Sequence, residues 1–136
     1  MTKKIIVAIL GAVIIVLSLI VLTNFNPIDH KSLEQTFVIS AVYFKNDGYA
    51  EINFHDKSSK TKHVVLEILG MPESFHKEYF SSSILEKIQI SSTPKYGWQS
   101  IPVILLVEHE EFGNIEIKTE IRPVEENPAK IIFNYG

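Results

Sequence analysis

The chain has 136 residues, 13 basic and 16 acidic side chains, a formal net charge of −3 and no cysteine. This length fits one compact domain with an additional terminal segment. The lack of cysteine excludes disulfides, thiolate nucleophiles and cysteine-ligated zinc sites, and the acidic balance argues against nucleic acid as a partner.

An apolar segment opens the chain. No charged residue lies between Lys4 and Asp29, and a helix over residues 1–25 is long enough to cross a hydrocarbon core about 30 Å thick. Pro27 disfavours helical backbone at Asn26 and ends the segment. The sequence therefore predicts one N-terminal transmembrane helix that stays in the membrane as a signal anchor. A cleaved signal peptide is the alternative, but the small-x-small cleavage site that it needs is missing.

The charges beside this helix indicate its orientation. Lys3 and Lys4 precede its apolar run, whereas Lys31 follows the helix among acidic residues. Positive charge is enriched on the cytoplasmic side of membrane helices. We therefore expect the N-terminus in the cytoplasm and the rest of the chain outside the cell membrane, with membrane lipid as one partner.

Small side chains mark one face of the predicted helix. Ala8, Gly11 and Ala12 are spaced so that a second membrane helix can approach closely there. They are the candidate residues for lateral helix packing.

Residues 26–35 read as a short polar linker, which reaches at most about 35 Å, and residues 36–136 read as one extracytoplasmic domain. In this domain, apolar or alternating runs are separated by turn residues such as Asn46-Asp47-Gly48, a strong hairpin signal. Residues 73–83 fit a short helix, a loop or an edge strand. The pattern is typical of an all-β fold, a single immunoglobulin-like β-sandwich of about seven strands.

Alternation along two neighbouring runs, residues 49–56 and 61–69, predicts which side chains are buried. The inward-facing set is Ala50, Ile52, Phe54, Val64, Leu66 and Ile68. If the two runs pair as a hairpin with Phe54 opposite Val64, a single register buries the whole set. We therefore expect these runs to be adjacent strands.

The same register places His55 and His63 opposite each other on the outer face. Two imidazoles on Cβ atoms about 5 Å apart could bind Cu²⁺ or Zn²⁺, so both residues are candidate metal ligands. Further ligands are out of reach, since Glu51 and Glu67 lie about 13 Å farther along the strands. A solvated sheet face is the competing interpretation.

Two further segments carry candidate chemistry. The stretch Glu108-His109-Glu110-Glu111 lacks the converging loop that calcium requires and is interpreted as a solubilising turn. In residues 93–98 (TPKYGW), Tyr96 and Trp98 are candidate binding residues, because rigid aromatic side chains give contact area at low entropic cost. The alternative is that Trp98 packs against the end of the sandwich.

Motifs for catalysis are not found. There is no nucleophile elbow, no phosphate-binding glycine loop and no Ser/His/Asp grouping that the predicted hairpins bring together, and no cofactor is expected. We therefore expect a non-enzymatic, membrane-anchored binding module with a protein partner. The alternatives are an accessory subunit of a larger membrane complex and an extracytoplasmic protein that handles copper or zinc.

Overall fold

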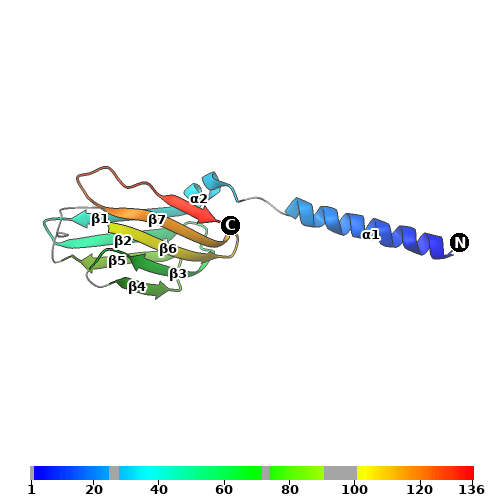
Figure 1. Ribbon diagram of the computed structural model, residues 1–136, viewed down its shortest axis with the longest axis horizontal. Coiled ribbons are helices and arrows are strands. Elements are labelled where there is room, and N and C mark those ends of the chain that lie inside the picture. Colours follow the sequence, from blue (N-terminus) through cyan, green and yellow to red (C-terminus); the bar gives the residue numbers. More distant parts are fainter. Residues whose placement is uncertain (1, 25–27, 72–73, 91–100) are drawn as a thin grey trace.

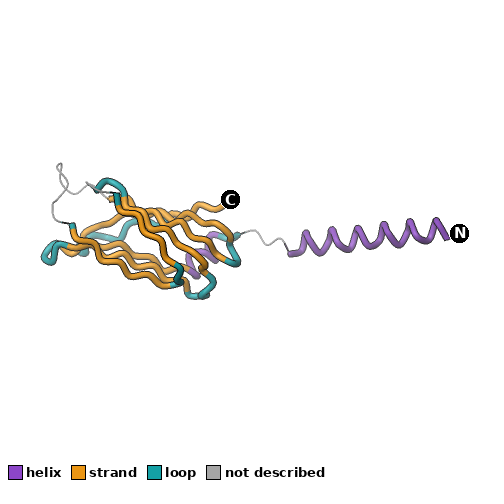
Figure 2. Tube along the Cα trace, turned by 90° about the horizontal axis from the view of Figure 1, so that it is seen from below, coloured by secondary structure: helices purple, strands orange, loops and turns teal. Residues whose placement is uncertain are grey.

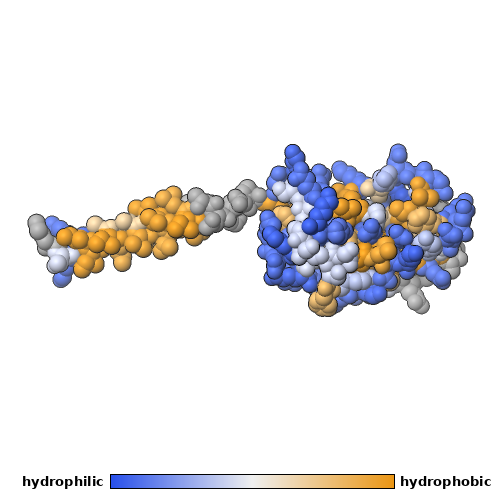
Figure 3. Space-filling model, turned by 180° about the vertical axis from the view of Figure 1, so that it is seen from behind, coloured by the Kyte–Doolittle hydropathy of each residue, from blue (hydrophilic) through white to orange (hydrophobic). Residues whose placement is uncertain are grey.

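The computed structural model describes residues 2–24, 28–71, 74–90 and 101–136. Among these residues, α1 (Thr2–Asn24) is the one helix long and apolar enough to cross a membrane, with a mean hydropathy of 3.0 and no buried side chain over its most apolar stretch. Figure 3 shows this helix apolar on nearly all of its visible surface, whereas the domain is mostly polar. The expected N-terminal apolar helix is confirmed.

A second helix, α2 (His30–Thr36), precedes the sheets. Asp29 caps its first turn by accepting a hydrogen bond from the backbone N–H of Lys31 (3.3 Å), the N-cap role for which aspartate is suited. Leu33 is fully buried in the core. The polar linker expected over residues 26–35 is thus a docked helix from residue 30 onward, because one apolar side chain fixes this short helix to the sandwich.

The rest of the described chain consists mainly of strands. They are β1 (Phe37–Phe44), β2 (Tyr49–Asp56), β3 (Thr61–Ile68), β4 (Phe75–Tyr79), β5 (Ser83–Gln89), β6 (Ile101–His109), β7 (Gly113–Pro123) and β8 (Ile132–Tyr135). Gly48 has a φ of +70° in the turn between β1 and β2, which confirms the predicted hairpin.

The strands form two packed layers (Figures 1 and 2). The first sheet has the order β5-β2-β1, and the second sheet has the order β4-β3-β6-β7, with β8 paired to β7. The layers are joined where the end of β7 pairs in parallel with β1, Val42 lying opposite Arg122. The all-β sandwich preceded by an apolar helix is therefore confirmed. Residues 75–79 of the ambiguous segment are an edge strand.

Side chains join the two layers at their other edge. Glu86 on β5 accepts hydrogen bonds from Lys77 Nζ (3.1 Å) and from the Tyr79 hydroxyl (2.5 Å), both on β4. Burial, together with the hydrogen bond to Glu86, raises the pKa of Tyr79 above its ordinary value. The sandwich is consequently close to a closed barrel.

The core lies between the layers, and the inward-facing set predicted from alternation is fully buried. The predicted hairpin between residues 49–56 and 61–69 is wrong, however. Phe54 lies opposite Ile39 on β1 and Ile84 on β5, whereas Val64 lies opposite Val107 on β6. Alternation determines which face of a strand is buried but does not select its neighbour, and the turn after β2 crosses from one sheet to the other.

The strand directions give the sandwich two different ends. The helix α2 and the turns at residues 57–60, 80–82 and 110–112 lie at one end, which we call the proximal end because the chain passes from it to α1. The turn at residues 45–48 lies at the opposite, distal end.

Candidate functional site

The two candidate metal ligands do not face each other. His55 lies on β2 between Val38 of β1 and Ser83 of β5, whereas His63 lies on β3 opposite Glu108 of β6. The predicted cross-strand histidine pair is therefore wrong, because the two strands belong to different sheets. Within the described residues, no group of three or more His, Asp and Glu side chains could hold a metal ion.

Asp56, the last residue of β2, is a fully buried carboxylate. Its Oδ1 accepts hydrogen bonds from the backbone N–H (2.8 Å) and the hydroxyl (2.6 Å) of Ser58. Its Oδ2 accepts from the backbone N–H of Lys60 (3.0 Å) and the hydroxyl of Thr61 (2.7 Å). Burial alone would raise the pKa of Asp56, but these hydrogen bonds lower it to about 2.

The same carboxylate shapes the turn at residues 57–60. Ser59 has a φ of 58° there, a left-handed conformation that costs about 1–3 kcal/mol for a residue other than glycine. The bonds from Asp56 to residues on both sides of Ser59 offset this cost. The turn that carries the chain between the two sheets therefore depends on Asp56.

His109, the last residue of β6, meets Asp56 from the other sheet. Its Nε2 lies 3.2 Å from Asp56 Oδ2, and neither side chain has any exposed surface. Its Nδ1 accepts hydrogen bonds from the backbone N–H groups of Glu111 (3.1 Å) and Phe112 (3.2 Å). Because Nδ1 accepts, the hydrogen-bond geometry assigns the ring proton to Nε2, which donates toward Asp56.

Ser58, His109 and Asp56 form a Ser/His/Asp grouping that the predicted hairpins did not bring together. Ser58 Oγ lies 2.6 Å from the Asp56 carboxylate and 3.1 Å from His109 Nε2. In a catalytic triad, serine and aspartate contact opposite nitrogens of the imidazole. Here both contact Nε2, and the serine proton is directed to the carboxylate. We therefore assign this cluster, which joins the two sheets at the proximal end, a structural role.

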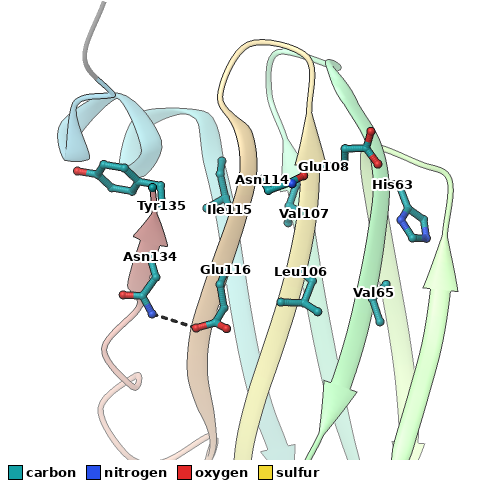
Figure 4. Close-up of a pocket in the computed structure, with 11 residues that line it drawn as sticks. His63, Val65, Leu106, Val107, Glu108, Asn114, Ile115, Glu116, Asn134 and Tyr135 are labelled. Atoms are coloured by element: carbon teal, nitrogen blue, oxygen red, sulfur yellow. Dashed lines mark hydrogen bonds between the residues drawn. The ribbon is translucent and has the colours of Figure 1, made fainter.

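The outer face of the second sheet carries an open groove of about 510 Å³ (Figure 4). Val65 and Leu106 lie side by side on its floor, and Leu106 remains 39% exposed. Glu108, Glu116 and His63 line the groove around them. These side chains point outward from β3, β6 and β7, so the fold does not use them for its core.

The groove is acidic. Glu116 pairs with Lys118 (2.9 Å) and accepts a hydrogen bond from Asn134 (3.0 Å), and these contacts lower its pKa. Glu108 has no side-chain hydrogen bond or ion pair among the described residues. The groove thus presents two carboxylate side chains beside an apolar floor.

The candidates from the sequence are distributed unevenly around this groove. His63 lines it, as does Glu108 of the acidic stretch, whereas His55 lies in the first sheet. Tyr96 and Trp98 lie outside the described residues. The groove itself was missed, because its residues occupy ordinary outward positions of separate strands and only the strand order brings them together.

The small residues of α1 lie on an uncovered helix. Ala8, Gly11 and Ala12 are exposed, and a Cβ added at Gly11 would meet no atom within 4 Å. Nothing in the described part of the chain packs against this face.

Comparison with protein-family models, curated proteins and solved structures finds no match.

Proposed function

We propose that the protein is a single-pass membrane protein whose extracytoplasmic sandwich is a non-enzymatic module that binds a protein partner through the groove on the second sheet. The observation that carries this proposal is the combination of an apolar floor at Val65 and Leu106 with an acidic rim at Glu108 and Glu116. Interfaces typically have an apolar centre surrounded by polar groups.

The strand arrangement supports a display role. The first, second and fifth strands share one sheet, and the third, sixth and seventh share the other. Immunoglobulin-like domains, which are common on cell surfaces, divide their strands in this way; here β4 joins the second sheet. We propose that the resemblance is one of architecture.

The partner surface is inferred from charge complementarity. The acidic side chains of Glu108 and Glu116 favour lysine or arginine side chains, and the floor favours one apolar side chain between them. We therefore propose a cationic segment of a protein with an exposed apolar residue as the occupant.

The location is tested by protease accessibility. Because Lys3 and Lys4 lie in the first turn of α1 and the domain follows the helix, protease added to intact host cells is expected to digest the domain and leave a short N-terminal fragment with the membrane. An outer-face protein and a cytoplasmic protein serve as controls. A domain that resists digestion while the outer-face control is cut contradicts the proposed orientation.

The groove is tested by charge reversal. Affinity purification of the full chain in mild detergent is expected to recover a stoichiometric companion. Substituting Glu108→Lys and Glu116→Lys together is expected to weaken its binding about 10-fold or more, because like charges then face each other. The matched control is Glu125→Lys with Glu126→Lys, which makes the same charge change in the exposed loop after β7.

The two variants separate the possible results. A companion that is lost only with the groove variant supports the groove as the binding site. A companion retained equally by both variants contradicts the groove as the binding site. If the companion is then lost in a Gly11→Leu variant, the accessory-subunit alternative is favoured, in which α1 packs laterally through its small residues.

A further inference from the structure

The proximal end carries an apolar side chain that the fold leaves outside. Phe80, in the turn between β4 and β5, is 80% exposed, the largest exposed fraction of any large apolar side chain in the described part of the domain. Tyr79 beside it is half-buried and bonded to Glu86. Exposing a phenylalanine ring to water is unfavourable. The residues and segments around Phe80 therefore indicate which apolar environment could cover it.

The Phe80 ring has a defined orientation. It stacks on the His63 imidazole with a centroid distance of 4.9 Å and an interplanar angle of 26°. His63 is held in turn by a contact with Glu78 (3.3 Å). The ring is therefore fixed at the corner where the outer face of the second sheet meets the proximal end.

The proximal end is held close to the point where α1 ends. Five residues, 25–29, separate α1 from α2, and the chain from residue 24 to residue 30 spans at most about 21 Å. Because Leu33 is buried, α2 cannot move away from the sandwich to lengthen this connection. If α1 crosses a bilayer, the proximal end lies within reach of its headgroup layer.

The neighbours of Phe80 suit a membrane interface. The turn at residues 80–82 continues with serines after Phe80. It is hydrogen-bonded to the end of β2, where the backbone N–H of Asp56 donates to the carbonyl of Ser82 (2.8 Å), and so lies beside the turn at residues 57–60. That second turn carries the exposed Lys57 and Lys60. Apolar side chains such as phenylalanine insert at the boundary between headgroups and acyl chains in peripheral membrane contacts, and lysine side chains extend their charged ends to the headgroup level.

The charges at the proximal end do not by themselves favour a contact with lipid headgroups. Glu110 and Glu111 lie at the same end as the two lysines, and Glu111 pairs with Lys60 (3.2 Å). The end is therefore not a basic patch that selects anionic lipid. An apolar ring supplies the attraction.

We propose that Phe80 docks the proximal end onto the headgroup layer of the bilayer that α1 crosses. This inference rests on the proposed membrane anchor and adds an orientation to it. The sandwich is held at two points, α1 and Phe80, and the groove, which begins at His63 beside Phe80, opens sideways just above the membrane. Its partner then approaches along the membrane surface.

The absence of cysteine allows a direct test. The full chain with Ser81→Cys carries one environment-sensitive fluorophore next to Phe80, and the chain with Val124→Cys carries it at the distal end, where Val124 is 52% exposed. Both proteins are reconstituted in phosphatidylcholine vesicles and isolated by flotation. We expect a blue-shifted emission and a loss of iodide quenching at position 81 but not at position 124.

A second variant assigns the effect to the ring. Adding Phe80→Glu to the Ser81→Cys protein is expected to restore iodide quenching to the value at position 124, while near-ultraviolet circular dichroism verifies that the domain remains folded. Quenching at position 81 that equals the distal value in proteins that float overturns the docking inference alone. Protein that fails to float overturns the anchor as well. Shielding that requires phosphatidylserine, or that survives Phe80→Glu, also overturns the role of Phe80.

Discussion

Replacing Asp56 with alanine is expected to lower the free energy of unfolding by about 3–5 kcal/mol. The change removes a buried carboxylate that accepts four hydrogen bonds within the turn at residues 57–60 and its neighbour Thr61. It also leaves the buried Nε2–H of His109 without its charged partner. Unsatisfied buried donors lose their solvation without compensation, so the effect exceeds that of an ordinary surface substitution.

The measurement is urea unfolding of the full chain in mild-detergent micelles, followed by near-ultraviolet circular dichroism. The described α1 contains no aromatic residue, so this signal reports on the domain. Asp47→Ala is the matched control, because Asp47 is an exposed aspartate in the turn between β1 and β2, and a change within about 0.5 kcal/mol is expected there. Equal losses for the two variants would contradict the structural role of Asp56.

Acid provides an independent readout of the same carboxylate. Its pKa is about 2 in the folded protein and 3.8 ordinarily, so its contribution, roughly 2 kcal/mol, is present above about pH 4 and is lost as the pH falls toward 2. The difference in stability between the wild type and Asp56→Ala is therefore expected to shrink over this window. A difference in stability that stays constant over this pH range would contradict a lowered pKa of Asp56 in the folded protein.

Replacing Leu33 with alanine is expected to lower the free energy of unfolding by about 2–5 kcal/mol, or to detach α2. Leu33 is the one buried side chain of α2, and a helix of seven residues is too short to persist without packing. The ring of His30 also meets Phe133 edge-on, with centroids 5.6 Å apart. Loss of the Leu33 side chain removes the contact that holds α2, and with it the ring of His30, against the sandwich.

Gln35→Ala provides the comparison, since Gln35 lies on the same helix and is exposed. Urea unfolding in micelles is expected to distinguish the two variants clearly, and similar stabilities would show that α2 is not held by Leu33. Detachment of α2 also lengthens the connection to α1. The fluorophore at position 81 is then expected to become more accessible to iodide in vesicles, which links the stability of α2 to the position of the domain.

Some polar features could have been read from the sequence more fully. Asp56 follows Phe54 by two residues, and His109 follows Val107 by two, so alternation assigns both polar residues to the inward face. Buried ionisable residues require hydrogen-bond or ion-pair partners. Two inward-facing polar residues at strand ends are therefore candidates to be partners of each other. The missing information was the strand order that places the ends of β2 and β6 together.

The sequence by itself determined the apolar helix, most of the strands and the buried face of each, because hydropathy and alternation are local properties of the chain. Only the tertiary structure decided that β2 pairs with β1 and β5 rather than β3, that Leu33 docks α2, and that Asp56 meets His109. It also brought Leu106, Glu108 and Glu116 into one groove. Strand pairing depends on contacts summed over the whole domain, and the same alternating pattern is compatible with several neighbours.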